Sequence, residues 1–84
     1  MHTQQLRKLE FLNVSQNGIR EISPNVKGLK NIVSMNLAHN QLKDLPREIS
    51  QLKNLKTLIL TGNPMENTTI EKLKLLMPQT QIYF

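Results

Sequence analysis

The chain repeats itself with a period of 23 residues. Residues 6–28, "LRKLEFLNVSQNGIREISPNVKG", align with residues 29–51, "LKNIVSMNLAHNQLKDLPREISQ", and both align with "LKNLKTLILTGNPMENTTIEKLK" from residue 52. A period of this size is typical of a repeat that cannot bury its apolar face alone and must stack on its neighbours. The best-matched columns are Leu6, Leu29 and Leu52; Leu9, Ile32 and Leu55; Leu12, Met35 and Leu58; Val14, Leu37 and Leu60; and Asn17, Asn40 and Asn63.

Within one repeat, the apolar residues follow the rhythm of neither a regular helix nor a long strand. In "SMNLAHNQLKDLP", residues 34–46, they stand two, then five, then three positions apart. The alternation of Met35 and Leu37 predicts a short strand with both side chains turned inward. A turn at Asn40 leaves backbone donors and acceptors in need of partners, which an amide side chain can supply. We therefore expect the asparagine column to stabilise the fold, and Pro46 to begin a short irregular or 3₁₀ stretch.

The whole pattern, L-x-x-L-x-x-L-x-L-x-x-N-x-L-x-x-L-P-x-x-I, resembles the leucine-rich repeat over nearly the entire chain from Leu6. The phrase "LPREISQLKNLKTLILTGNP" and the tail "IEKLKLLMPQTQIYF" resemble most the short-repeat bacterial proteins of leptospiral type. The resemblance implies an α/β fold, a leucine-rich-repeat solenoid with a short parallel sheet. It also implies non-catalytic protein binding through the concave sheet face. One domain would span residues 1–84, with repeats at about 6–28, 29–51 and 52–67 and a C-terminal helix-strand cap at 68–84.

The predicted cap begins where the third copy leaves the pattern. Thr68 occupies a position where the repeat asks for an apolar residue, and "NTTIEKLKLLMPQ" instead has the spacing of a helix over about 69–77. Thr68 and Glu71 have the spacing of a capping box, and Pro78 would end the helix. The alternation in "TQIYF" predicts a closing strand that contains Ile82 and Phe84. Four parallel strands are then expected, centred near Leu12, Met35, Leu58 and Ile82.

The outward strand residues are expected to line up in rows, because adjacent strands lie about 4.8 Å apart. Most of them are small and polar, and the exceptions are Phe11, Ile59 and Tyr83. Aromatic anchors among small polar groups are typical of a protein-binding patch, although single exposed apolar residues are also normal on any protein. The sequence therefore predicts a partner-binding set that consists of Phe11, Asn13, Asn36, His39, Ile59 and Tyr83.

The net charge of +5 raises the alternative of a polyanion as partner. Arg7, Lys30 and Lys53 form one basic column, but no aromatic column accompanies it for base stacking, so nucleic acid is disfavoured. No catalytic, cofactor-binding or metal-binding residues are predicted, because there is no cysteine and no glycine-rich phosphate loop. The two histidines, His2 and His39, provide too few ligands for a zinc site.

The first repeat lacks a predicted cap, since only the polar stretch "MHTQQ" precedes Leu6. That stretch lacks the apolar core of a secretory signal, and no apolar run approaches the roughly 20 residues that span a bilayer. An uncovered first layer and an unpaired edge strand invite association with another chain. We therefore expect a homo-oligomer joined through the N-terminal ends, with the alternative that the chain is a structural or regulatory fragment of a longer repeat array. The sequence does not indicate a compartment.

Overall fold

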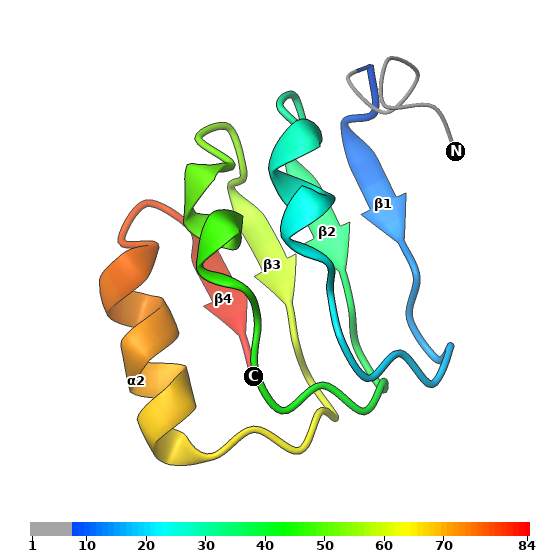
Figure 1. Cartoon of the computed structure of the whole chain (residues 1–84), viewed down its shortest axis with the longest axis vertical. Helices are drawn as coiled ribbons and strands as arrows, with labels where there is room; N and C mark the ends of the chain where they lie inside the picture. Colours follow the sequence, from blue (N-terminus) through cyan, green and yellow to red (C-terminus); the bar gives the residue numbers. More distant parts are fainter. Residues whose placement is uncertain (1–7) are drawn as a thin grey trace.

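Each repeat forms one coil of a solenoid in the computed structural model, which describes residues 8–84 (Figure 1). The four strands form one parallel sheet in the order β1-β2-β3-β4. Leu12 pairs with Met35, Met35 with Leu58, and Leu58 with Ile82, so the four predicted strands and their centres are confirmed. The strand bounds are β1 Phe11–Asn13, β2 Ser34–Asn36, β3 Thr57–Ile59 and β4 Gln81–Tyr83.

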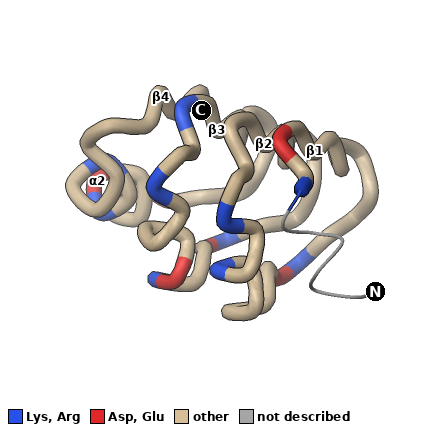
Figure 2. Tube along the Cα trace, turned by 90° about the horizontal axis from the view of Figure 1, so that it is seen from above, with Lys and Arg blue, Asp and Glu red and all other residues tan. Residues whose placement is uncertain are grey.

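The chain returns from each strand to the next through a helical segment on the other side of the molecule. These segments are η1, Pro24–Gly28; η2, Arg47–Gln51; and α2, Asn67–Leu76. Seen from above, the strands lie on one side, the return segments on the other, and α2 stands at the β4 end (Figure 2). Pro46 is the cap residue of the 3₁₀ helix η2, as its fixed φ predicts. No helix within residues 8–84 is long and apolar enough to cross a membrane.

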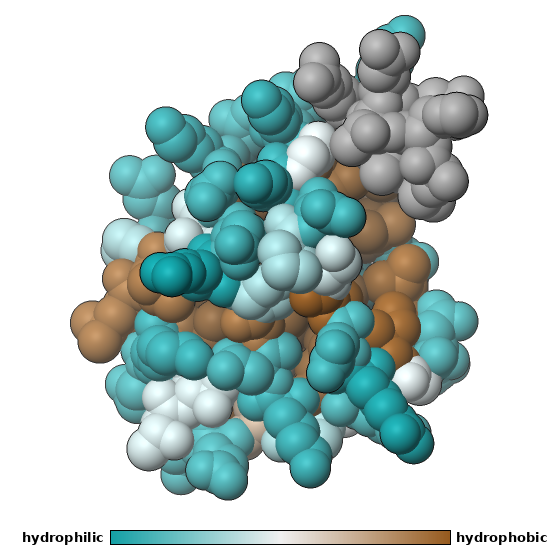
Figure 3. Space-filling view, viewed as in Figure 1, coloured by the Kyte–Doolittle hydropathy of each residue, from teal (hydrophilic) through white to brown (hydrophobic). Residues whose placement is uncertain are grey.

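The core fills the space between the sheet and the return segments, and its burial changes along the solenoid. We name the repeats coil 1 (8–28), coil 2 (29–51) and coil 3 (52–66). In coils 2 and 3 the core columns are almost fully inaccessible apart from the half-buried Met65, and Ile32 and Leu58 are both at 0% exposure. In coil 1 Val26 is buried, but the other core side chains are only half-buried, and Figure 3 shows apolar surface in this region. These half-buried residues are Leu9, Leu12, Val14, Ile19 and Ile22.

Asn40 joins coil 2 to coil 1, as the asparagine column predicts. Its side chain is 6% exposed, and its Oδ1 accepts hydrogen bonds from the backbone N–H groups of Asn17 at 2.9 Å and Ile19 at 3.0 Å. Its Nδ2 donates to the carbonyl oxygens of Val14 at 3.1 Å and Leu37 at 2.9 Å. One buried amide thus satisfies backbone groups of two coils, which is what a turn without a regular ladder needs.

The other two members of the column follow the same geometry to different extents. Asn63 accepts from the Leu42 N–H at 3.0 Å and donates to the carbonyls of Leu37 and Leu60, each at 2.9 Å. Asn17 is exposed, and within residues 8–84 its side chain donates only to the Ser15 carbonyl, at 3.1 Å. The structural role of the column therefore depends on a preceding coil for the side chain to reach.

The C-terminal cap forms, but two details of its prediction are wrong. The helix α2 begins at Asn67, its N-cap residue is Glu66, and no side chain caps it, so the predicted Thr68–Glu71 capping box is absent. The chain enters the helix directly after Met65, which packs against the core and leaves Thr68 already inside the first turn. At the other end, Phe84 lies beyond β4 and remains 40% exposed. The cap covers the last core layer with Leu73 and Met77, which are both buried.

Candidate partner-binding face

One side of the sheet is free of return segments, and we call its eight outward strand residues the open face. The strand register arranges these residues in two rows. Five of the six predicted partner-binding residues belong to the open face, and four of those five share one row. The first row is Asn13, Asn36, Ile59 and Tyr83, and the second is Phe11, Ser34, Thr57 and Gln81.

The open face carries no charged side chain, although the net charge of the chain is +5. The nearest charged residues along the chain, Glu10 and Lys56, come directly before β1 and β3 and are exposed. A charged group of a partner would lose hydration over this face without gaining an opposite charge, which is unfavourable. The open face therefore suits an uncharged surface or segment.

The two asparagines of the first row each have their side-chain orientation fixed by the backbone. Asn36 Oδ1 accepts from the Ala38 N–H at 3.0 Å, and Asn13 Oδ1 accepts from the Ser15 N–H at 3.1 Å and the Ser15 hydroxyl at 2.8 Å. A backbone N–H only donates, so the amide oxygen must face it and the Nδ2 group must point away. Neither Nδ2 has a protein partner within residues 8–84, so two amide donors on adjacent strands are available to a ligand.

The other half of the first row is apolar. Ile59 is half-buried and pairs in register with Tyr83, whose side chain is 50% exposed. Phe11 is more exposed, at 68%, but it lies on β1 in the second row. The structure therefore brings Ile59 and Tyr83 together and leaves Phe11 apart from them. An exposed aromatic beside a branched aliphatic side chain forms a small apolar platform that can anchor a partner side chain.

His39 lies beside the open face, at the end of β2. Its backbone is left-handed, with φ of 57°, and its repeat equivalents Gln16 and Gly62 have φ of 59° and 80°. The imidazole lies across Gly62, because a Cβ placed on that glycine would stand 2.8 Å from the His39 Cε1 atom. We did not predict this contact from the sequence. The glycine in a column with Gln16 and His39 is the signal that marks the left-handed position.

Comparison with known proteins places this geometry in a family. The family model described as "Leucine rich repeat" matches residues 7–65. The chain belongs to the leucine-rich-repeat family. A solved structure of a leucine-rich-repeat protein from Leptospira interrogans is 35% identical, with a TM-score of 0.92 over all of this chain. This chain spans 22% of the length of that protein. A comparison with curated protein sequences found no match.

Leucine-rich-repeat domains generally mediate protein interactions and are typically non-enzymatic. Within residues 8–84, no group of three or more His, Cys, Asp or Glu side chains is placed to hold a metal ion. Three of the residues considered in the sequence, His2, Leu6 and Arg7, lie outside the described residues. The remaining members of the basic column, Lys30 and Lys53, are exposed, and both precede the strands.

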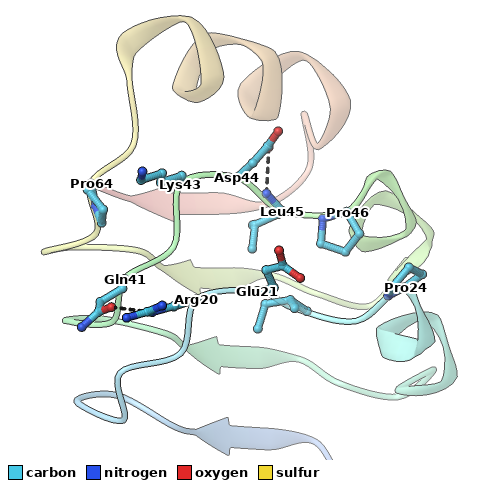
Figure 4. A pocket seen from close by; sticks show the side chains of 10 residues that line it. Arg20, Glu21, Pro24, Gln41, Lys43, Asp44, Leu45, Pro46 and Pro64 are labelled. Carbon is cyan, nitrogen blue, oxygen red and sulfur yellow. Dashed lines mark hydrogen bonds between the residues drawn. The ribbon is translucent and has the colours of Figure 1, made fainter.

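The return side of this leucine-rich-repeat domain has a hollow of about 740 Å³ that the sequence did not predict (Figure 4). It lies between the return paths of coils 1 and 2, where Arg20 Nε donates to Gln41 Oε1 at 3.1 Å. Asp44 lies at the other end of the hollow, and burial by itself would raise the pKa of its carboxyl. Hydrogen bonds from Lys72 Nζ and the Leu45 N–H, together with the Lys72 charge, outweigh burial and lower that pKa below its ordinary value. Lys72 Nζ and Asp44 Oδ2 lie 3.0 Å apart, and this ion pair links coil 2 to α2.

Proposed function

We propose that the chain is a non-catalytic protein-interaction module whose open face contacts the partner. The observation that carries the proposal is the first row of the sheet, in which Asn13 and Asn36 adjoin Ile59 and Tyr83 without any charge. Interface centres are poor in charge and rich in aromatic anchors, and small polar groups surround those anchors. Phe11 and His39, the other predicted contacts, flank the row and provide further exposed ring surface.

The double substitution Ile59→Ser and Tyr83→Ser tests this proposal. Because both side chains lie outside the buried core, the variant should keep its circular dichroism spectrum and a cooperative melting transition. It should lose capture of the protein that a photo-crosslinking amino acid at position 81 labels in the native chain. The matched control is Leu75→Ser, which removes an 82% exposed leucine from α2. Equal capture by the double variant and the native chain would refute binding through the open face.

Self-association through coil 1 is a second proposal, and a specific observation favours it. Leu12 and Val14 are half-buried, whereas their repeat equivalents Met35 and Leu37 are each 1% exposed beneath a neighbouring coil. A second copy that covers coil 1 would bury these side chains and pair the edge strand β1. The alternative is stacking on further repeats of a longer array.

An added consensus coil before residue 6 tests the self-association proposal. The addition should raise the melting temperature and shift the chain to the monomer in sedimentation experiments, because it covers the same apolar layer. A native chain that sediments as a monomer at millimolar concentration, without any gain from the added coil, would contradict self-association. Cross-linking between β1 residues of two copies would distinguish a dimer from non-specific aggregation.

A further inference from the structure

We infer that the open face recognises an uncharged, extended peptide segment of the protein partner. In this arrangement peptide carbonyl oxygens accept from Asn13 and Asn36, and an apolar side chain sits on Ile59 and Tyr83. The inference rests on the proposed function and specifies the chemistry of the partner. It derives from three features of the described residues: the fixed amide donors, the distance from these donors to the apolar pair, and the absence of charge.

The amide donors require an acceptor. Each Nδ2 group carries two N–H bonds, and in Asn13 and Asn36 the fold uses only the oxygen of the same amide. The two side chains are in register on adjacent parallel strands, which lie about 4.8 Å apart. An extended peptide that crosses the strands presents backbone carbonyls along its whole length, each with two lone pairs, whatever its sequence. Backbone carbonyls are therefore a general complement to this donor pair.

The distance between the donors and the apolar pair sets the spacing of the ligand. The midpoint of Asn13 and Asn36 is separated from the midpoint of Ile59 and Tyr83 by two strand spacings, or about 9.6 Å. An extended chain advances about 3.3 Å per residue, so this distance corresponds to about three residues. The anchored side chain should therefore stand about three residues from the carbonyl that the asparagines bind.

The absence of charge limits the residues between these two contacts. No acidic or basic side chain lies on the open face, so an Asp, Glu, Lys or Arg in the middle of the segment would lose hydration without compensation. A carboxylate on the donor pair is the competing occupant. It is disfavoured because no lysine belongs to the row. Lys56 comes directly before β3, and Lys30 and Lys53 lie further from the strands along the chain.

A selection from a random seven-residue peptide library on phage, carried out on the full chain, tests the inference. Selected peptides should contain an aromatic or branched aliphatic residue with three uncharged neighbours on one side. The best sequences, synthesised with blocked termini, are then titrated against the native chain. Tyr83 is the only tyrosine and the chain has no tryptophan, so with peptides that lack Tyr and Trp the intrinsic fluorescence reports directly on the open face. The side-chain NH₂ resonances of Asn13 and Asn36 should shift on binding.

The decisive variant is the double substitution Asn13→Asp and Asn36→Asp. Aspartate keeps an oxygen for the Ser15 and Ala38 N–H groups, so the local turns remain, but it replaces both outward donors with acceptors. Affinity for the selected peptides should fall at least about ten-fold, because the carbonyls lose their donors and face negative charge. The control, Asn25→Asp with Asn67→Asp, adds the same charge at exposed positions outside the open face.

Three results would overturn the inference. Unchanged peptide affinity in the variant with Asn13→Asp and Asn36→Asp would exclude the donor role. The proposed function would still stand in that case if Ile59→Ser with Tyr83→Ser abolished capture of the protein partner. Enrichment of acidic peptides would replace the uncharged class with a carboxylate ligand. No enrichment on the native chain over the Ile59 and Tyr83 double variant would exclude an extended peptide as the occupant. Crosslinking of a folded protein surface at position 81 would then support the proposed function alone.

Discussion

Substitution of Asn40 by alanine tests the structural role of the asparagine column directly. Alanine removes five side-chain hydrogen bonds at once, two from N–H groups of coil 1 and three to the carbonyls of Val14, Leu37 and Ala38. The backbone φ of Asn40 is not positive, so alanine introduces no backbone strain at this position. Any loss of stability can therefore be assigned to the unpaired backbone groups.

The expected loss follows from how deeply these groups are buried. A buried backbone group without a partner costs about 1–3 kcal/mol, and water can reach the half-buried Val14 and Ile19 more easily than Leu37. We expect Asn40→Ala to lower the free energy of unfolding by about 3 kcal/mol, counting one full penalty and partial penalties for the rest. A chain of 84 residues has roughly 4–13 kcal/mol of total stability, so the effect is a large fraction of the whole.

The column supplies its own controls, because the same substitution can be made in each coil. Asn63→Ala removes three hydrogen bonds from a half-buried side chain and should cost about 2 kcal/mol. Asn17→Ala removes one hydrogen bond at an exposed position and should cost less than about 0.5 kcal/mol. Urea unfolding followed by circular dichroism measures all three, and a loss of 3 kcal/mol lowers the midpoint by about 2 M. Equal losses at Asn17 and Asn40 would refute the reasoning.

Three further predictions concern other parts of the molecule. Gly62→Ala should lower the free energy of unfolding by about 1–2 kcal/mol, because φ at this position is 80° and the new Cβ displaces the His39 ring. Adding His39→Ala should remove the clash with the ring but not the backbone strain, so thermal melts should show only partial recovery. Lys72→Ala should cost less than about 1 kcal/mol at neutral pH, since both partners are half exposed. Because the pKa of Asp44 is lowered, its ionised carboxyl stabilises the fold at pH values above its ordinary pKa. The difference in unfolding free energy between the variant and the native chain should therefore disappear as the pH falls below about 4. A difference that stays constant over a pH series would contradict this. Heparin and double-stranded DNA should not bind at physiological salt, and tight binding that weakens steeply with added salt would establish the polyanion alternative.

The sequence predicted the strands and their register because each apolar column corresponds to one position in the core. Met35 and Leu58 had to face inward together, and a shift of one residue would have exposed both. The start of α2 could not be predicted from Thr68 and Glu71, because the packing of Met65 on the core decides where the helix begins. Local capping preferences are worth about 1 kcal/mol, and the partial burial of the Met65 side chain can match that amount.

The open face was predicted in composition but not in detail. Register alone placed Asn36 beside Asn13 and Ile59 beside Tyr83. The direction of each amide depends on a hydrogen bond two residues along the chain, and the position of the His39 ring depends on its contact with Gly62. The hollow on the return side depends on side chains of two coils that meet only after the coils have stacked. These features follow from tertiary geometry, which repeat spacing does not specify.

Two asparagines of coil 2, Asn36 and Asn40, have opposite consequences for binding. Asn40 uses both ends of its amide on backbone groups, so it has nothing left for a ligand. Asn36 uses only its oxygen among residues 8–84, and its Nδ2 group has no partner in that part of the chain. In the third coil and the cap, Ile59 and Tyr83 occupy the same row as Asn36 without any change in strand register. Because the core columns determine that register, the row can change its chemistry from one strand to the next at little cost to the fold. Substitutions in the row that keep an oxygen for the Ala38 N–H should therefore change which partner binds while leaving the melting temperature nearly constant.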